Sequence, residues 1–466
     1  MSETLGTPAR PLRVAVVGSG PSGFYAAEAL FRREGLEVRV DVFDRLPTPY
    51  GLVRYGVAPD HQKMKAVIRA YEKTASRPGF RYFGHVELGK DLSVEELHAH
   101  YDQIIYAMGA ETDKRLGIPG EDLEGSLSST AFVGWYNGHP NHESLEVDLG
   151  CRRVAVIGIG NVAMDVVRVL LRKPEELAET DIADYSLEAI RRSPIREIYL
   201  LGRRGAGQAA FTPKEIEEVG KLEGVDLVVD PAQAGEAELE GLEPGTPEYK
   251  NVEYLRAKAA EGEGSHERKV RLILLASPVE ILGADGRVTG LRYEKNTLVD
   301  NGRGGLKAQG TGETAELEVG LVIRAVGYRG LRVPGVPFHE AWGIIPNEEG
   351  RVRGEDGSPR TAEYVVGWAK RGPSGLIGTN KGDSAATVEK MIEDLPSTEP
   401  APHGGEDAAT IRLLEDRGVE WVSFEDWKLL DRLETERGEA RGRVREKILG
   451  VEGAMAALRE AKAQNA

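Results

Sequence analysis

The chain has 466 residues, 40% of them hydrophobic, and a formal net charge of −16. That length exceeds what one hydrophobic core usually organises, so we expect more than one ordered domain. No apolar run approaches the roughly 20 residues that span a bilayer, and residues 1–11 lack the apolar core of a secretory signal. We therefore expect a cytoplasmic protein without membrane insertion, and we expect no nucleic-acid partner.

The only cysteine in the sequence, Cys151, limits the redox chemistry that the chain can carry. One thiol excludes a Cys-X-X-Cys dithiol pair, and it excludes an iron–sulfur cluster held by this chain, which needs about four ligands. We expect Cys151 to be a small buried or edge residue. The nine histidines are scattered without a group at metal-ligand spacing, so we expect no metal site.

In chain order, the first predicted element is a β-branched strand from residue 13 that runs into a glycine-rich turn, with Gly18, Gly20 and Gly23, and then a helix. A backbone without Cβ atoms can approach a pyrophosphate closely, and the amino end of a helix stabilises its negative charge. The next predicted strand, residues 38–44, ends in Asp44. A carboxylate there can accept hydrogen bonds from both hydroxyls of an unphosphorylated adenosine ribose, as in FAD or NAD. A carboxylate that merely ends a strand in solvent is the alternative.

A second unit of the same kind begins at residue 153. Its strand leads through Gly158 and Gly160 into another helix, and its next strand ends in Arg203 and Arg204 with no acid. Guanidinium groups bind a 2′-phosphate through charge-assisted hydrogen bonds, whereas a carboxylate would repel it. This pattern favours NADPH over NADH, with a solvated arginine pair as the alternative. Two such loops in one chain indicate two dinucleotides, and electron transfer between them.

Two irregular segments rich in glycine and proline complete the set of motifs. Residues 46–63 form a rigid stretch that no core strand would use. Residues 364–380 join Trp368 to a glycine-rich turn that opens a helix. Such a turn can place backbone N–H groups and an aromatic face beside an isoalloxazine ring.

At these segments the sequence resembles the adrenodoxin-reductase-type ferredoxin–NADP⁺ reductases, including their bacterial members. The resemblance also covers the loop from Gly158 to Asp165 and residues 202–211, and it continues in the same order from residue 13 to residue 389. The string Leu-Pro-Thr-Pro-Tyr-Gly-Leu-Val-Arg at 46–54 is far more specific than a dinucleotide loop. The segment from residue 406 onward resembles the variable tail of the bacterial members less specifically.

The resemblance implies FAD and NADP(H) as cofactors and assigns residues to each. Besides the loop residues Gly18 and Gly20, the implied FAD contacts are Ser22, Asp44, Leu52, Val86, Trp368, Gly375, Leu376 and Ile377. The implied NADP(H) contacts are Lys114, Ile159, Gly160, Asn161, Val162, Arg203, Arg204 and Glu215. The family usually has Gln or Asn where this chain has Ile159, and Arg where it has Lys114. These departures remove one side-chain hydrogen bond and weaken a bidentate contact, so we expect the nucleotide preference to persist and the affinity to differ.

The expected fold class is α/β, with two dinucleotide-binding domains of the Rossmann-like, three-layer type and the NADP domain inserted into the FAD domain. The expected boundaries are an FAD-binding domain in two parts, residues 1–109 and 329–396, an NADP-binding domain at 110–328, and a linker with a charged C-terminal extension at 397–466. Residues 173–194 are expected to be an extra excursion, and residues 231–248 an exposed loop. We expect two helices in the C-terminal extension, with a mostly solvated surface.

The implied activity is that of an FAD-dependent ferredoxin–NADP⁺ reductase. Hydride transfer from nicotinamide to flavin would be followed by one-electron steps to ferredoxin or a similar small iron–sulfur protein. His61 and Glu218 are the candidate catalytic side chains, expected near the flavin in proton relay or NADP⁺ positioning. A structural hydrogen bond for His61 and an exposed helix carboxylate for Glu218 are the alternatives.

Two other functions stay open at this stage. One is the flavin subunit of a larger NADPH-dependent complex, like the small chain of glutamate synthase, although such chains usually carry cysteines for clusters. The other is a flavoprotein without enzymatic activity, kept for assembly or sensing.

An acidic reductase must concentrate basic residues where an acidic ferredoxin docks. The candidates lie in the Arg203–Arg204 region and at Lys250, Arg256, Lys258, Arg268, Lys269 and Arg271. Ordinary solvated charges are the alternative, because no spacing rule groups these residues.

Overall fold

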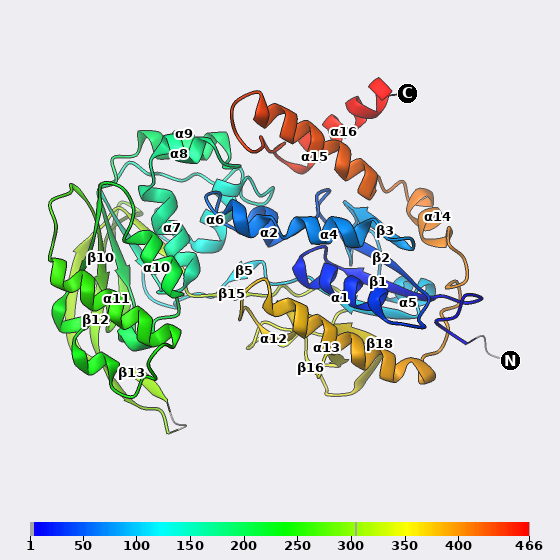
Figure 1. The fold of residues 1–466 in the computed structure, drawn as a ribbon, viewed down its shortest axis with the longest axis horizontal. Helices are drawn as coiled ribbons and strands as arrows, with labels where there is room; N and C mark the ends of the chain where they lie inside the picture. The colour runs from blue at the N-terminus through cyan, green and yellow to red at the C-terminus, as the bar shows by residue number, and fades with distance from the viewer. Residues whose placement is uncertain (1–3, 303–304, 466) are drawn as a thin grey trace.

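The computed structural model describes residues 4–302 and 305–465, which form two lobes (Figure 1). The first lobe is built on a seven-stranded sheet of order β16-β17-β18-β4-β1-β2-β3. Its strands are β1 (Leu12–Val17), β2 (Val38–Asp44), β3 (Phe80–Gly84), β4 (Gln103–Tyr106), β16 (Asn347–Glu348), β17 (Arg351–Arg353) and β18 (Pro359–Val365). Strand β1 pairs in parallel with β2 and β4, and β4 pairs in parallel with β18. The sheet therefore joins segments from both ends of the chain.

Helices cover both faces of this sheet, and alternation along β1 shows why. Val14 and Val16 point into one core, whereas Ala15 and Val17 point into the other. Because both faces are buried, β1 is almost continuously apolar. The first core takes residues from α1 (Pro21–Arg32), α4 (Ile68–Ala75) and α13 (Thr379–Asp394), and the second from α5 (Val94–His100) and α12 (Trp368–Arg371).

The second lobe is built on a six-stranded sheet whose paired neighbours all run in parallel. In sheet order the strands are β6 (Ser126–Ser128), β14 (Leu321–Arg324), β7 (Arg153–Ile157), β8 (Glu197–Leu201), β10 (Arg268–Ile273) and β9 (Val225–Val229). One face packs on α6 (Ser129–Asn137), α7 (Asn161–Leu171), α10 (Pro213–Val219) and α11 (Pro247–Glu261). The other face packs on a three-stranded antiparallel sheet, β11 (Ala276–Ala284), β12 (Arg287–Asp300) and β13 (Leu306–Glu318).

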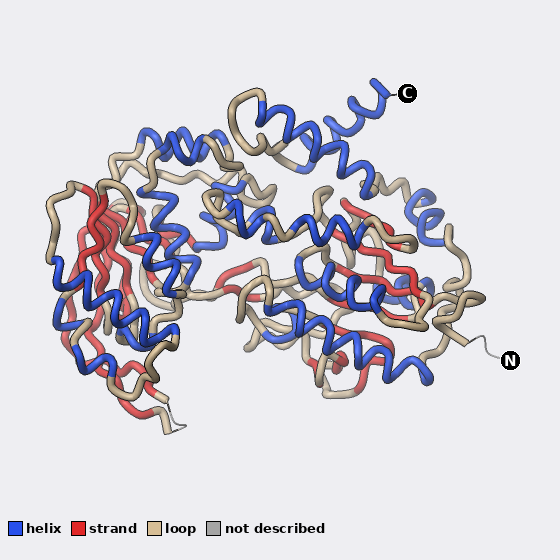
Figure 2. The backbone as a smooth tube through the Cα atoms, viewed as in Figure 1, coloured by secondary structure: helices blue, strands red, loops and turns tan. Residues whose placement is uncertain are grey.

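The two lobes are joined where the chain leaves the first lobe and returns to it. Strands β5 (Thr112–Asp113) and β15 (Tyr328–Arg329) form an antiparallel two-stranded ribbon there. In Figure 2 this narrow connection lies between the two groups of strands. Two short helices of the first lobe also reach this region, α2 (Leu52–Tyr55) and α3 (Gln62–Lys65).

Three smaller expectations can be compared with the structure. Residues 173–194 do leave the helix–strand path, and they form α8 (Pro174–Ala178) and α9 (Asp184–Arg192). Residues 231–248 are mostly exposed and include two short 3-10 helices, Pro231–Gln233 and Glu236–Leu239. Cys151 is half-buried just before β7.

The prediction of two helices in the C-terminal extension is wrong. The described part of the extension contains three, α14 (Ala409–Asp416), α15 (Phe424–Glu439) and α16 (Val451–Asn465). The extension also packs on the first lobe, because Phe424, Trp427 and Leu430 lie on one helical face and are buried in its core. The few large apolar residues are spaced for burial, although the segment as a whole is rich in charge.

In the part of the chain that the structure describes, no helix is both long enough and apolar enough to cross a bilayer.

Candidate functional site

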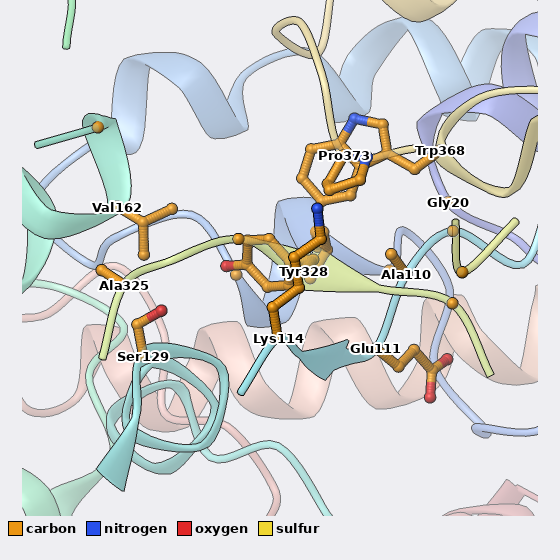
Figure 3. Close-up of a pocket in the computed structure, with 18 of the residues that line it drawn as sticks. Gly20, Ala110, Glu111, Lys114, Ser129, Val162, Ala325, Tyr328, Trp368 and Pro373 are labelled. Carbon is orange, nitrogen blue, oxygen red and sulfur yellow. The ribbon is translucent and has the colours of Figure 1, made fainter. Parts of the chain in front are cut away.

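A cavity of about 1410 Å³ lies where the two lobes meet. Pockets for single ligands typically measure about 300–1,000 Å³, so this one has room for more than one molecule. Both glycine-rich loops line it, each at the carboxyl end of a parallel strand, which is where open α/β sheets bind ligands. Figure 3 shows Gly20 from the first loop and Val162 from the second on opposite sides, with Tyr328 and Lys114 between them.

All the predicted cofactor-binding residues line this one cavity, although they come from segments far apart in sequence. They are Gly18, Gly20, Ser22, Asp44, Leu52, Val86, Lys114, Ile159, Gly160, Asn161, Val162, Arg203, Arg204, Glu215, Trp368, Gly375, Leu376 and Ile377. Their contacts with a nucleotide stay a prediction.

The first glycine loop fits a closely approaching pyrophosphate. Gly18 has φ +109°, and a Cβ added to it would lie 2.5 Å from the carbonyl oxygen of Ala107. A Cβ on Gly23 would lie 2.2 Å from the carbonyl oxygen of Gly18. Gly20 has no atom within 4 Å of an added Cβ, so at this position the absent side chain leaves space in the cavity. The fold itself requires Gly18 and Gly23, whereas Gly20 keeps the backbone accessible.

In the second loop, too, one glycine is required by the fold and another leaves space in the cavity. A Cβ on Gly158 would lie 2.2 Å from the carbonyl oxygen of Ala325, whereas one on Gly160 would meet nothing within 4 Å. Gly160 precedes α7, so the N–H groups at the start of that helix face the cavity side. The side chain of Asn161 accepts a hydrogen bond from the backbone N–H of Thr212 at 2.9 Å, which fixes the loop to the segment before α10.

Asp44 ends β2 at the first loop, as the sequence predicts. Its carboxylate accepts hydrogen bonds from the backbone N–H groups of Ser19 at 2.9 Å and Leu46 at 3.0 Å, and from the Ser19 hydroxyl. An ionised carboxylate offers about four lone-pair positions, so it retains capacity toward the cavity that it lines. The position suits a ribose hydroxyl.

Arg203 and Arg204 follow β8 at the other end of the cavity. Two hydrogen bonds hold their backbone. The Asn296 side chain donates to the carbonyl of Arg203 at 2.8 Å, and the N–H of Leu275 donates to the carbonyl of Arg204 at 3.2 Å. Over residues 4–302 and 305–465, neither guanidinium group has a carboxylate oxygen within 4.0 Å. Both guanidinium groups are therefore free to bind an anion. They stand where the first unit has the carboxylate of Asp44.

The segment after β18 supplies an aromatic wall. The rings of Trp368 and Tyr328 lie 5.2 Å apart, and Figure 3 shows Lys114 extending toward them past Tyr328. The turn that follows is held by the Thr379 hydroxyl, which accepts a hydrogen bond from the N–H of Leu376 at 3.1 Å. Gly375 in this turn has φ +81°, a conformation that L side chains rarely adopt.

The two candidate catalytic residues come from different lobes and contact each other. His61 Nε2 lies 2.7 Å from Glu218 Oε2. His61 lines the large cavity, whereas Glu218 lines an adjoining cavity of about 420 Å³ that His61 also borders. The pair thus separates the two cavities. Glu218 is a partly exposed helix carboxylate that has His61 as a partner, and its catalytic role stays a prediction.

Behind this pair lies a buried ionic cluster that the sequence did not reveal. The guanidinium group of Arg168, with a fully buried side chain, donates to Asp60 at 2.9 Å, to Glu215 at 2.6 Å and to Asp165. Arg168 also lies 3.8 Å from Glu218. Four carboxylates therefore surround Arg168, and Arg172 adds a second guanidinium group 3.2 Å from Asp60. Asp165 and Glu215 also line the large cavity.

Burial and the neighbouring charges shift the pKa values of two carboxyl groups in this cluster in opposite directions. Burial raises the pKa of Asp165 to about 6, although Arg168 and His61 lower it. Burial also raises the pKa of Glu218, but the His61 hydrogen bond and Arg168 lower it more, so it lies below its ordinary value. Asp165, which lines the large cavity, therefore takes up a proton at a higher pH than an ordinary aspartate does.

His61, Glu215 and Glu218 could in principle hold a metal ion, because one ligand atom from each lies within 4.8 Å of the others. Each of these atoms already has a partner, since His61 contacts Glu218 and Arg168 donates to Glu215. The expectation of no metal site stays a prediction.

Four of the basic residues expected at a docking face in the second lobe already have partners. Lys258 pairs with Glu261, Lys269 with Glu263, and Arg271 with both Glu197 and Glu263. Arg268 donates to two backbone carbonyls. Pairing with nearby acids weakens three of the expected cations, which a list of basic positions could not show, and the docking face itself stays a prediction.

Two dinucleotide-binding lobes that share one cavity define a pyridine-nucleotide oxidoreductase. Residues 12–180 match the family model described as pyridine nucleotide-disulphide oxidoreductase. The NADPH-ferredoxin reductase FprA of Mycobacterium tuberculosis is 44% identical, over 94% of this chain and 97% of that protein. The mitochondrial NADPH:adrenodoxin oxidoreductase of Salvelinus fontinalis is 40% identical, over 96% of this chain and 91% of that protein.

A solved structure of Mycobacterium tuberculosis FprA in complex with NADPH superposes with a TM-score of 0.89, at 43% identity, over 96% of this chain and all of that one. The chain belongs to the family of the NADPH-ferredoxin reductases FprA and the NADPH:adrenodoxin oxidoreductases. The family resemblance and the α/β fold class expected from the sequence are thereby confirmed.

Proposed function

We propose that this protein is an FAD-dependent ferredoxin–NADP⁺ reductase, which moves electrons between NADPH and ferredoxin or a similar small iron–sulfur protein. The observation that supports this most is the single cavity lined by both glycine loops, with Asp44 near one loop and the arginine pair near the other. When bound, FAD supplies the conversion between two-electron and one-electron chemistry, because it accepts a hydride and releases electrons singly. The names of the relatives support the same partner and nucleotide.

The first task of the protein residues is to orient the two nucleotides head to head. Gly20 and Gly160 leave their backbone open toward the cavity, so each loop can hold a pyrophosphate at the start of a helix. Arg203 and Arg204 bind the 2′-phosphate that distinguishes NADPH from NADH. Tyr328 and Trp368 form a wall between the two ends and would flank the reacting rings of the bound nucleotides.

The second task is to manage the proton that NADPH oxidation by a one-electron acceptor releases. His61 lies between the large cavity and Glu218, and Glu218 lines the second cavity. A proton on His61 Nε2 therefore has an acceptor 2.7 Å away on the side remote from the nucleotides. Asp165 and Glu215, held by Arg168, present carboxyl groups on the nucleotide side of His61.

The positions of the strands support the domain boundaries proposed from the sequence. The first sheet uses strands within residues 12–106 and 347–365, and the second uses strands within 126–324. We assign the FAD-binding domain to 1–109 and 329–396 and the NADP-binding domain to 110–328. A cytoplasmic location belongs to the same proposal, and cell fractionation would test it.

Steady-state kinetics of the purified, FAD-loaded protein tests this function. The protein should oxidise NADPH with ferricyanide as acceptor, and should reduce cytochrome c only when ferredoxin is added. Ferredoxin reduction that requires an added partner subunit would favour the flavin subunit of a larger complex. Failure to oxidise NADPH with either acceptor would contradict the enzymatic assignment.

A further inference from the structure

The C-terminal segment lies along one side of both lobes, where no cofactor residue is expected. In Figure 1, α15 and α16 lie above α2 and α4 of the first lobe, and the loop between α15 and α16 extends toward α9 of the second. The segment also joins the first sheet, because Val422 forms an antiparallel bridge with Gly84 at the end of β3. Residues 422–450 are called the strap below.

On the first lobe, the strap forms hydrogen bonds with the irregular segment, residues 46–63, part of which lines the cavity. Trp427 donates to the Tyr50 hydroxyl at 3.2 Å, and Glu434 accepts two hydrogen bonds from Arg54, at 2.8 and 2.5 Å. The Arg54 guanidinium group also lies 5.1 Å from the ring centres of both Trp427 and Tyr55. Residues 51 and 52 and Tyr55 face the cavity from the same stretch, so the strap supports that wall from behind.

On the second lobe, the strap binds the excursion that carries α8 and α9. Lys447 donates to the backbone carbonyl of Asn137 at 3.0 Å and lies 3.1 Å from Asp181 Oδ2. Arg443 donates to the carbonyls of Thr180 and Ile182 at 3.2 and 2.5 Å. The excursion thus has a partner outside its own lobe, which accounts for its departure from the ordinary helix–strand path.

Asp181 is the point where the two lobes and the strap meet. It also accepts two hydrogen bonds, at 2.7 and 2.6 Å, from Lys65 in α3 of the first lobe. All three side chains are buried, with 7%, 3% and 7% of Lys65, Asp181 and Lys447 exposed. Because all three groups are buried, moving either lysine away from Asp181 breaks a polar contact that water cannot readily replace.

We propose that the strap fixes the angle between the two lobes, with Lys447 and Glu434 as positioning residues that act through Asp181 and Arg54. Without it, the covalent link between the lobes is the ribbon of β5 and β15. The contacts between the lobes then include those of α2, α3 and the His61 region, and the hydrogen bond from Arg45 to Asn141. The structural part of this proposal is independent of the reaction. The effect on NADPH kinetics rests on the proposed function, because the nucleotides are expected to meet between the lobes.

The variant Lys447→Met tests the strap and leaves Asp181 paired with Lys65. The matched control is Lys428→Met on α15, which removes an exposed lysine that pairs with Glu425 on the same helix. Hydrogen exchange of the FAD-loaded protein should become faster in residues 52–65 and 177–187 in Lys447→Met only, because local opening exposes these amides. The KM for NADPH should rise by about tenfold in Lys447→Met with an unchanged flavin absorption spectrum, since misplacement of bound groups is costly.

Glu434→Gln keeps the shape of the second contact and provides an independent variant if Lys447→Met does not fold. It should speed exchange in residues 52–65 and raise the KM in the same direction. The proposal would be overturned if hydrogen exchange in residues 52–65 and 177–187 were unchanged in either folded variant. So would uniform loss of protection across β1 and β2, because the strap would then only stabilise the first lobe. Failure of the proposed function would look different, since the unmodified protein itself would not oxidise NADPH.

Discussion

Replacing Asp165 with asparagine should change how the stability of the protein depends on pH. The pKa of Asp165 is raised from 3.8 to about 6 by burial. Between these values the folded protein holds a proton that the unfolded chain releases, so the stability of the native protein falls as pH rises. A shift of about two pKa units corresponds to ~3 kcal/mol, reached in full above pH 6. An asparagine side chain does not titrate, so Asp165→Asn should gain that amount relative to the native protein between pH 4 and pH 6.

Thermal unfolding of the FAD-loaded protein, followed at several pH values across this range, measures the difference. The control is Asp285→Asn, at an exposed turn with φ +50°, a conformation that asparagine also accepts. The curves of the control and the native protein should run in parallel, whereas that of Asp165→Asn should diverge upward as pH rises. Parallel curves for all three proteins would refute the reasoning that burial of Asp165 makes the folded protein bind a proton that the unfolded chain releases.

Three further predictions concern the nucleotides and the partner. The double change Arg203→Ala with Arg204→Ala should raise the KM for NADPH by at least about tenfold, because each charged hydrogen bond contributes roughly 1.5–3 kcal/mol. The KM for NADH should stay nearly the same, and equal losses for both nucleotides would contradict the assignment. Gly160→Ala should keep the fold and weaken NADP⁺ binding measured by titration, whereas Gly158→Ala should destabilise the protein, since only its Cβ would meet backbone. Lys269→Ala should change the ferredoxin on-rate by less than about twofold in stopped-flow measurements, because its charge already pairs with Glu263; a larger drop would restore the docking role first expected for this region.

Much of the fold could be predicted because its signals are local. The loops at Gly18 and Gly158 follow buried strands, and the residues that end the next strands, Asp44 and Arg203, lie on the cavity as expected. Parallel strands have their carboxyl ends at the same edge of the sheet, so residues that follow these strands in sequence lie around the site. The contact between His61 and Glu218, which 157 residues separate, was not predicted, because the family resemblance implied only that each lies near the flavin.

Other features could not be predicted because they depend on long-range pairing. Arg168 lies on a helix three residues after Asp165, and nothing in that spacing shows that Asp60 and Glu215 complete its surroundings. The charge of the C-terminal extension suggested a solvated surface, yet Glu434 is buried against Arg54 from the other end of the chain. From the sequence, Lys269 was a candidate for a free positive charge at a docking surface, whereas in the fold it pairs with Glu263.

The order of strands in the first sheet has a consequence for synthesis on the ribosome. Strand β18 pairs with β4, although more than 250 residues are made between them, and those residues contain the whole second sheet. Domains generally fold as units while the chain emerges. The second lobe can therefore complete its core while the first half of the other sheet still lacks its partner strands. Residues 422–450 are made later still, so the nascent protein acquires two folded lobes before it acquires the contacts that align them.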